Sequence, residues 1–370
     1  MAQMQAKPER LPLPIEVEEA KSDKSDSGME NESVGEYEED GFFDVDSLLE
    51  HNIPVEDIKQ LKKVGINTIK GLQMCTSRSL ATLKGFTPAT VEKIKHACAI
   101  ITNATTENCF MTGLEVSAQR RHIFQLTTGS KNINAILGGG IESMAITEVF
   151  GESRSGKTQL AHTLCVTAQL PNEAQEYQGG KVMFIDTEST FRPDRIKPIA
   201  DRFELDSSGV LENILCARAY NSEQLYELLT SAGNVFHKDP GMFKLLIIDS
   251  IMAPFRVDFI GAGEMSERQT KLGLMLSKLQ KMSEEYNIAV FLTNQITTDM
   301  SQPLTLLNNA EVKPIGGNVL AHATTTRMVL KRGQFQERIA KIYGSPNLEE
   351  QETKFDITLG GITDPKPQDE

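Results

Sequence analysis

The residues with the clearest chemical pattern form the segment Gly151-Glu152-Ser153-Arg154-Ser155-Gly156-Lys157-Thr158, directly followed by Gln159. The pattern G-x4-G-K-T lies between an apolar strand-like run and a helical pattern, which is the context of a phosphate-binding loop. Its glycines let backbone amides wrap the phosphates, and the helix N-terminus adds a partial positive charge. We expect Lys157 to reach the β and γ oxygens of ATP and the Thr158 hydroxyl to ligate Mg²⁺.

Three further polar residues stand at the ends of apolar, strand-like runs. Asp249 ends Leu245-Leu246-Ile247-Ile248 and suits a ligand of the water shell around Mg²⁺. Glu188 follows Asp186 and Thr187, and is a candidate to polarise the water that attacks the γ-phosphate. Gln295 offers a neutral amide that can sense that phosphate. For Glu188 and Gln295 the alternative is ordinary capping of a strand end.

The segments that must position these residues alternate between β-rich runs and helical patterns. This alternation predicts an α/β fold with a mainly parallel central sheet covered on both faces, and with late strands that are antiparallel. Helices are expected at Thr158–Leu170 and Glu267–Tyr286, and strands at Ala145–Phe150, Val182–Asp186, Ile214–Ala219, Leu245–Asp249, Ala289–Thr293, Thr325–Leu330 and Ile339–Tyr343.

A compact, all-helical pattern precedes this part of the chain, over residues 42–101. Two turns punctuate it, Val64-Gly65-Ile66 and Lys84-Gly85-Phe86, and Thr87 before Pro88 is a helix start. Two helices joined by a hydrophobic-Gly-hydrophobic turn predict a helix-hairpin-helix, whose turn amides can hold a nucleic-acid phosphate. The alternative is a small packing domain without nucleic-acid contact.

Length and charge complete the division into domains. We expect an acidic disordered tail at 1–41, the helical domain at 42–101, a linker at 102–125 and the α/β domain at 126–370. The net charge is −13, but the first 40 residues hold 12 acidic and 4 basic residues, so they account for −8 of it. A mildly acidic remainder can still present a basic groove, so the total charge does not exclude nucleic acid as a partner.

Two classes of protein are not expected from the composition. No apolar run approaches the roughly 20 residues that span a bilayer, so we expect no membrane-spanning or exported protein. The cysteines are scattered and odd in number, without a C-x-x-C pair, which predicts small apolar core residues in a reducing compartment rather than a disulfide framework or a zinc site; they are Cys75, Cys98, Cys109, Cys165 and Cys216.

Taken together, the motifs resemble those of the eukaryotic RecA-like DNA strand-exchange recombinases. The resemblance runs from about residue 42 to residue 363, and Gly139–Glu148 and Thr163–Pro171 are closest to the meiosis-specific branch. The motifs that carry it, besides the helix-hairpin-helix and the phosphate-binding loop, are Leu126-Thr127-Thr128-Gly129-Ser130, Gly138-Gly139-Gly140-Ile141-Glu142, Asp186-Thr187-Glu188, Phe191-Arg192-Pro193, Asn294-Gln295 and Pro314-Ile315-Gly316-Gly317.

This resemblance implies a RecA-type P-loop ATPase core whose protomers assemble into a helical filament on single-stranded DNA, a ring being the alternative resting form. ATP and Mg²⁺ lie between neighbouring subunits. Lys157, Glu188 and Gln295 match the catalytic positions, Thr158 and Asp249 the magnesium positions, and Arg195 an arginine that packs on adenine. Double-stranded DNA and recombination mediator proteins are further expected partners, in the nucleus.

The resemblance also implies DNA and subunit contacts. The two DNA-binding loops fall at Gly261–Arg268, with Lys271 beside it, and at Ile296–Pro314, which includes Lys313. Arg154, Lys331 and Lys341 match a second, basic DNA site. Phe110 matches an aromatic anchor that plugs into the next subunit, Gly113 lies in the same linker motif, and His322 matches a histidine that contacts the neighbour's phosphate-binding loop. The alternatives are a structural role for His322 and packing of Phe110 on its own core.

Several positions depart from the family pattern. Ser153 stands where an aromatic residue contacts the neighbour's histidine, and Ser189 replaces the glycine after the catalytic glutamate. Gly113 replaces the alanine of the linker motif, and Ala262, between Gly261 and Gly263, replaces an arginine of the first DNA loop. A proline and a basic residue are missing near Ala310–Pro314. We therefore expect Arg268 and Lys271 to take over phosphate contacts from the first loop.

These observations predict an ATP-dependent recombinase that pairs homologous DNA and exchanges strands in meiotic recombination and double-strand break repair. The alternative from another functional class is a non-catalytic mediator paralogue on the same fold, which would load or remodel filaments. A ring helicase built on a RecA core is a third, more distant alternative.

Overall fold

The computed structural model describes residues 43–102, 110–297, 313–333 and 337–365. By its contacts the chain divides into two units, Met1–Gly41 and Phe42–Glu370. The expected acidic tail lies outside the described residues, as do Cys109 and the departure near Ala310. The domain boundaries expected inside the second unit, at 101 and 125, stay predictions.

Short helices around one apolar cluster make up residues 45–101. Thr87 caps the last helix as expected, since its side chain accepts a hydrogen bond from the backbone N–H of Thr90. Gly65 and Gly85, in the two expected turns, have φ of 83° and 92°, a region that favours glycine. The segments are η1 (Val45–His51), α1 (Val55–Lys63), α2 (Ile69–Gln73), α3 (Ser77–Ala81) and α4 (Pro88–Ile101).

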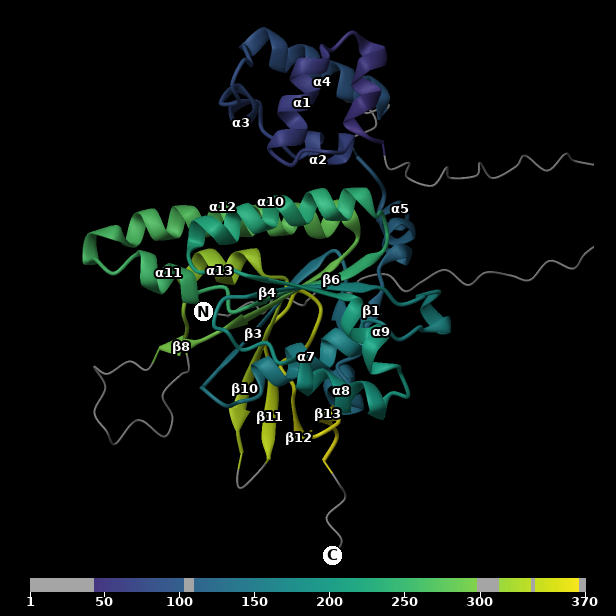
Figure 1. The fold of residues 1–370 in the computed structure, drawn as a ribbon, viewed down its shortest axis with the longest axis vertical. Coiled ribbons are helices and arrows are strands. Elements are labelled where there is room, and N and C mark those ends of the chain that lie inside the picture. Colours follow the sequence, from purple (N-terminus) through teal and green to yellow (C-terminus); the bar gives the residue numbers. More distant parts are fainter. Residues whose placement is uncertain (1–42, 103–109, 298–312, 334–336, 366–370) are drawn as a thin grey trace, which may run out of the picture. The chain divides into compact units, whose positions relative to one another are not determined.

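A nine-stranded sheet organises the rest of the described chain (Figure 1). Its order is β13-β12-β11-β10-β3-β7-β6-β4-β5, parallel from β10 to β5 and antiparallel from β10 to β13. The strands are β3 (Ala145–Gly151), β4 (Lys181–Asp186), β5 (Ile214–Arg218), β6 (Phe243–Asp249), β7 (Ala289–Asn294), β10 (Thr326–Arg332), β11 (Arg338–Gly344), β12 (Glu352–Thr358) and β13 (Gly361–Thr363).

Alternate residues of the parallel strands enter two different hydrophobic cores. On β4, Val182 and Phe184 pack into one cluster, while Met183 and Ile185 pack into the other. This is the pattern of a sheet covered on both faces. In Figure 1, α7 (Lys157–Thr167), α8 (Pro193–Arg202) and α9 (Ser207–Glu212) lie on one face, and α10 (Ser222–Lys238), α12 (Met265–Tyr286) and α13 (Gly317–Ala323) on the other.

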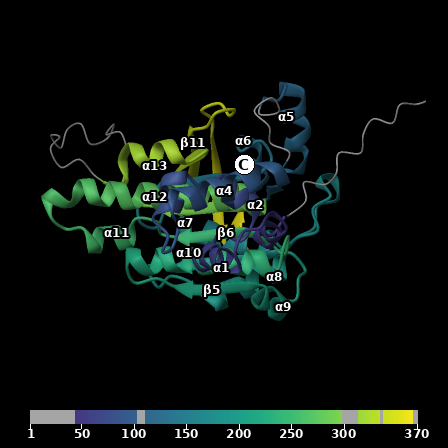
Figure 2. The same ribbon diagram turned by 90° about the horizontal axis from the view of Figure 1, so that it is seen from above.

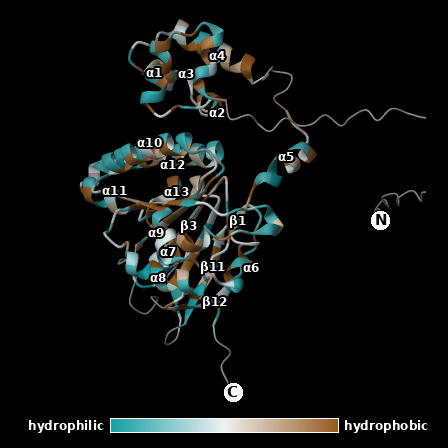
Figure 3. Cartoon of the chain, turned by 45° about the vertical axis from the view of Figure 1, so that its right-hand side comes forward, coloured by the Kyte–Doolittle hydropathy of each residue, from teal (hydrophilic) through white to brown (hydrophobic). Residues whose placement is uncertain are grey.

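The helices on the second face are amphipathic. Figure 3 shows hydrophilic residues interleaved with hydrophobic ones along α10 and α12. On α12 the buried positions recur at helical spacing, at Leu272, Leu276 and Leu279 among others. One face of each helix is therefore available to the core, and the other faces solvent.

Short elements connect these layers. They are α5 (Gly113–Gln119), η3 (Arg120–His122), β1 (Gln125–Leu126), α6 (Lys131–Ile136), β2 (Ile141–Glu142), η4 (Glu173–Gln175), α11 (Ala253–Asp258), η5 (Ala262–Glu264), β8 (Ile296–Thr297) and β9 (Lys313–Pro314). Strand β1 pairs with β2, and β8 pairs with β9, both antiparallel.

The fold class expected from the sequence is confirmed: a mainly parallel α/β sheet of the RecA type, preceded by a helical region. All seven expected strands are present within two residues of their expected ends. Strands β12 and β13 were not expected, because β12 is mostly exposed or half-buried and lacks a continuous apolar run. Residues 45–51 form a 3-10 helix rather than an α-helix.

The cysteine interpretation holds for Cys98 and Cys165, which are buried, and fails for Cys216, which is exposed on β5. Each of the four described cysteines is a free thiol. In the described part of the chain, no helix is both long enough and apolar enough to cross a bilayer.

Candidate nucleotide site at the carboxyl edge of the sheet

The phosphate-binding loop begins where β3 ends and leads directly into α7. Gly151 has φ of 157°, and a Cβ there would lie 2.2 Å from the carbonyl oxygen of Leu330 on the neighbouring strand β10. Gly156, with φ of 113°, directly precedes α7. Only glycine fits the first position, so the backbone turns tightly enough for its amides to face a phosphate.

The polar groups inside this loop suit an anion. The Lys157 ammonium donates to the carbonyls of Gly151 and Glu152, both at 2.8 Å. Burial lowers the pKa of Lys157, although the charges of Asp249, Glu188 and Glu152 oppose the shift. The buried hydroxyl of Ser155 has no hydrogen-bond partner among the described residues. A buried, unsatisfied hydroxyl beside a lysine fits a phosphate group in the loop.

Asp249 is the centre of the hydroxyl groups at this edge. Its buried carboxylate accepts hydrogen bonds from Thr158 at 2.8 Å, from Thr190 at 3.0 Å, and from Thr293. These threonines come from α7, from the loop after β4 and from β7. A hydroxyl and a carboxylate side by side are oxygen ligands of the kind that Mg²⁺ prefers, so Thr158 and Asp249 fit the ion.

Glu188 lies next to the γ-phosphate sensor expected from the sequence. Its Oε1 accepts hydrogen bonds from Gln295 Nε2 at 2.7 Å and from Ser250 Oγ at 2.5 Å. Gln295 Oε1 accepts from Arg256, which lies on α11. The two strand-end residues named from the sequence are therefore in direct contact, rather than separate caps.

Asp186 holds the loop that carries Glu188. Its carboxylate accepts from the backbone N–H groups of Glu188, Thr190 and Phe191 at 3.0 to 3.2 Å, and Arg218 pairs with it at 2.9 Å. Ser189 inside this loop has φ of 61°, in the left-handed region. The glycine-to-serine departure thus falls at a position where the backbone favours glycine.

Arg195 is anchored at the far side of the loop. Its Nε donates to Gln159 Oε1 at 2.7 Å, and its other nitrogens donate to the carbonyls of Thr358 and Leu359. The guanidinium therefore connects α8 and α7 to the turn between β12 and β13. That turn was not expected from the sequence.

The candidate DNA residues lie on several elements. Gly261 and Gly263 border or fall within η5 (Ala262–Glu264), and Arg268 and Lys271 lie in the first turns of α12, which begins two residues earlier than expected. Lys271 pairs with Glu267 at 3.2 Å. Lys313 is exposed on β9, whereas residues 298–312 of the second loop lie outside the described chain.

The residues of the expected second DNA site are not equally free. Arg154 and Lys331 are exposed, at the phosphate-binding loop and on β10. Lys341 on β11 pairs with Glu350 at 3.3 Å, an exposed pair of small energetic weight.

The candidate subunit contacts lie at the surface of the chain. The Phe110 side chain is 93% exposed, and Gly113 begins α5. This exposure contradicts packing of Phe110 on its own core. Ser153 is exposed in the phosphate-binding loop and His322 is exposed on α13.

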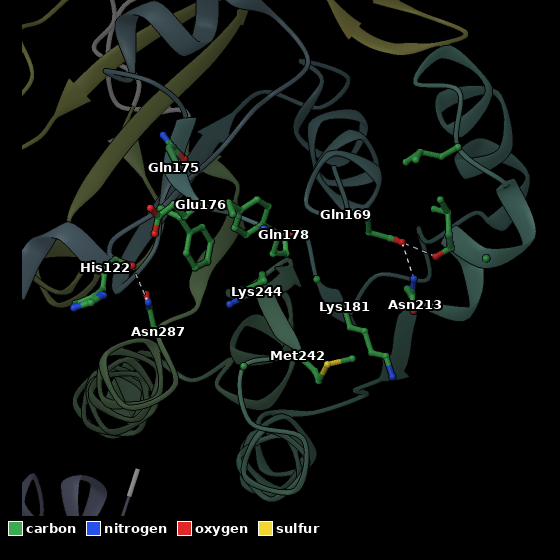
Figure 4. A pocket seen from close by; sticks show the side chains of 18 of the residues that line it. His122, Gln169, Gln175, Glu176, Gln178, Lys181, Asn213, Met242, Lys244 and Asn287 are labelled. Atoms are coloured by element: carbon green, nitrogen blue, oxygen red, sulfur yellow. Dashed lines mark hydrogen bonds between the residues drawn. The ribbon is translucent and has the colours of Figure 1, made fainter. Parts of the chain in front are cut away.

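A cavity of about 810 Å³ lies at the other, amino-terminal edge of the sheet (Figure 4). Lys181, Met242 and Asn287, which line it, stand at or just before the starts of β4, β6 and β7. Lys244 extends toward the ring of Phe124, 5.3 Å from its centroid. None of the residues expected to function lines this cavity, so it is distinct from the nucleotide site.

Sequence reasoning missed the residues that hold the site together: Ser250, Arg256, Arg218, Thr190 and Thr293. Ser250 directly follows Asp249, and a polar residue at that place is a weak signal. Nothing in the spacing of Arg256 relates it to Gln295, which lies 39 residues further along the chain.

The chain is similar to known recombination proteins over most of its length. The model of the family described as Rad51 matches residues 119–365. The meiotic recombination protein DMC1/LIM15 homolog of Homo sapiens is 56% identical over 344 residues, which cover 93% of this chain and 99% of that protein. The meiotic recombination protein DMC1 homolog of Lilium longiflorum is 47% identical over 338 residues, which cover 91% of this chain and 94% of that protein.

Proposed function

The chain belongs to the Rad51 family, and from that membership we propose that it is an ATP-dependent recombinase of meiotic recombination. It assembles on single-stranded DNA, pairs it with homologous double-stranded DNA and exchanges the strands. The alternative of a non-catalytic mediator paralogue is not favoured, because the similar proteins are themselves meiotic recombination proteins and are matched over nearly their full length.

One observation carries the enzymatic part of the proposal. The phosphate-binding loop, the Thr158–Asp249 pair and the Glu188–Gln295 pair all lie at the carboxyl edge of the parallel strands. Ligands of open α/β sheets bind at this edge. The groups needed to bind, orient and hydrolyse ATP are thus next to one another.

The residues have separate roles in the proposed reaction. Lys157 exchanges its two loop carbonyls for the β and γ oxygens of ATP, and Arg195 lies where it can pack on the adenine. Thr158 and Asp249 hold Mg²⁺, which when bound supplies positive charge to the phosphates. Glu188 orients the attacking water, and Gln295 senses the γ-phosphate.

Assembly of subunits rests on Phe110 and on an edge of the sheet. Strand β5 pairs with β4 alone among the described strands, so its other edge is unpaired (Figure 2). Leu215 on β5 is 37% exposed, and Tyr220 and Tyr226 beside it are 70% and 44% exposed. An open edge with apolar side chains suits an extended segment carrying an aromatic anchor. We assign β5 and α10 as the acceptor of the neighbour's Phe110.

The remaining assignments follow from the proposed activity. The first and second loops and Lys313 contact the single strand, and Arg154, Lys331 and Lys341 contact the incoming duplex. The hairpin turns at Gly65 and Gly85 are candidate phosphate contacts of a helix-hairpin-helix. Strand exchange during meiosis takes place in the nucleus, which is therefore the proposed location, with mediator proteins as partners.

A strand-exchange assay tests the proposal. The full chain is incubated with a single-stranded circle and a homologous duplex in ATP, ADP or a slowly hydrolysed ATP analogue, each with Mg²⁺. We expect exchange with ATP and the analogue, none with ADP, and none with Lys157→Ala. Lys197→Ala, a matched removal of an exposed lysine on α8, serves as control. Absence of exchange by the wild type under all conditions would favour the mediator.

A further inference from the structure

Arg256 joins the region of the first DNA loop to the hydrolytic residues. It lies on α11 (Ala253–Asp258), five residues before Gly261, and its guanidinium donates to Gln295 Oε1. Gln295 in turn donates to Glu188 from its Nε2 at 2.7 Å. A single amide side chain therefore separates an exposed cation from the carboxylate that orients water.

Gln295 also marks the base of the second loop. The residues after it form β8 (Ile296–Thr297), which pairs with β9 (Lys313–Pro314), and its carbonyl accepts from the Ile315 N–H at 3.0 Å. Its side chain thus lies where both candidate DNA loops are rooted. A change at either loop has a direct route to this amide.

The partner of Arg256 is weaker than the ligand that the proposed function brings. Among the described residues no carboxylate lies within ion-pair distance of its guanidinium, and its hydrogen bond goes to a neutral amide oxygen. A phosphate offers a charged, bidentate partner, and such hydrogen bonds are about twice as strong as those between neutral groups. A DNA phosphate that reaches this exposed guanidinium therefore displaces Gln295.

Glu188 is occupied while Gln295 stays in place. Its Oε1 accepts from both Gln295 and Ser250, and one carboxylate oxygen has about two lone-pair sites. That oxygen then has no free site for a water. The Arg256 hydrogen bond also polarises the Gln295 amide and strengthens its donation to Glu188.

From these contacts we propose that Arg256 is a positioning residue that holds Gln295 on Glu188 until a DNA phosphate takes the guanidinium. Once Gln295 is released, Glu188 Oε1 is free to orient water, and Gln295 is free to face the γ-phosphate. DNA binding and hydrolysis are thereby coupled through a side chain that touches neither ATP nor water. The inference rests on the proposed DNA-dependent ATPase function.

The test compares ATP hydrolysis without DNA and at saturating single-stranded DNA, with saturation verified for each variant by fluorescence anisotropy. For Arg256→Ala we expect DNA-free hydrolysis to rise by about 2- to 10-fold, the effect of removing one hydrogen bond. The ratio of stimulated to basal rate should fall toward 1. Arg256→Lys keeps the cation and should restore part of both effects, which separates the proposal from misfolding.

Two further variants sharpen the result. Arg268→Ala removes a neighbouring guanidinium that contacts Met265 rather than Gln295. It should require more DNA for half-maximal stimulation and keep the ratio at saturation. On a Gln295→Ala background, Arg256→Ala should change the DNA-free rate no further, because both act through one amide.

The outcomes are distinguishable. A ratio that Arg256→Ala leaves unchanged overturns the inference, whatever the absolute rates. A ratio that collapses without a rise in DNA-free hydrolysis makes Arg256 a DNA-binding residue only, and also overturns it. If the wild type hydrolyses ATP equally with and without DNA, the proposed function fails and the inference fails with it.

Discussion

The Thr158 hydroxyl donates a 2.8 Å hydrogen bond to Asp249 Oδ2, across 91 residues of sequence. The bond joins the first turn of α7 to the end of β6, two elements that both lead into the nucleotide site. It also brings together the hydroxyl and the carboxylate that fit Mg²⁺. The same bond therefore contributes to the fold without nucleotide and to metal binding with it.

The first prediction concerns this pair. Thr158→Val keeps the shape of the side chain and removes the donor, so a buried carboxylate loses one of its three hydroxyl partners. We expect the free energy of unfolding without nucleotide to fall by about 1–3 kcal/mol. Chemical denaturation measures it, and Thr158→Ser, which keeps the hydroxyl, is the control. A valine variant as stable as the wild type would show that the bond contributes nothing.

The second prediction concerns the departure at Ser189. A non-glycine residue in the left-handed region costs roughly 1–2 kcal/mol, and the greater freedom of glycine in the unfolded chain offsets about half of a gain on removal. Ser189→Gly should therefore raise the free energy of unfolding by about 0.5–1 kcal/mol. Ser189→Ala keeps Cβ and should not. Equal stability of the glycine variant and the wild type would contradict the strain argument.

The third prediction concerns assembly. Burial of an aromatic side chain contributes about 1.5–3 kcal/mol, so Phe110→Glu should weaken self-association by about 10- to 100-fold or more. Leu215→Glu should do the same from the acceptor side. Each variant keeps one intact surface, so an equimolar mixture should form heterodimers and nothing larger, which light scattering detects.

Leu274→Glu is the control for this experiment, because Leu274 is an exposed apolar residue on α12, away from β5. It should oligomerise normally. Heterodimers that fail to form from the mixture, while each variant alone is monomeric, would mean that β5 is not the acceptor of Phe110.

The fourth prediction concerns the first DNA loop. Arg268 Nε is buried without a hydrogen-bond partner in the described chain, so its guanidinium is available to a phosphate. Arg268→Ala should lower the affinity for single-stranded DNA and reduce the salt slope by about 0.7 for each phosphate that the variant no longer neutralises. Ala262→Arg should raise both, because it restores a cation where the family has one.

Binding measured by anisotropy across a salt series decides this prediction. Lys197→Ala, on α8, removes an equal charge and should leave the slope unchanged. If neither Arg268→Ala nor Ala262→Arg alters the slope, the first loop does not contact phosphates, and the mediator alternative gains support.

Local pattern was sufficient for much of the fold. The strands that end in Asp186, Asp249 and Asn294 could be identified because both of their faces are buried, which leaves continuous apolar runs. The phosphate-binding loop could be identified because glycines at fixed spacing are needed where a backbone must approach phosphates. Strands β12 and β13 could not, because half-exposed strands at a sheet border carry no such run.

The sequence by itself thus determined the elements, the loop that binds phosphate and the strand-end residues Glu188, Asp249 and Gln295. Only the tertiary structure decided how they meet. Strand order places β6 between β7 and β4, and this brings Thr293 and Thr190 onto Asp249. The hydrogen bond of Arg256 to Gln295 likewise depends on side chains from distant segments. Such contacts leave no periodic trace in a sequence, because periodicity records which face of an element is buried, and not which residue lies opposite.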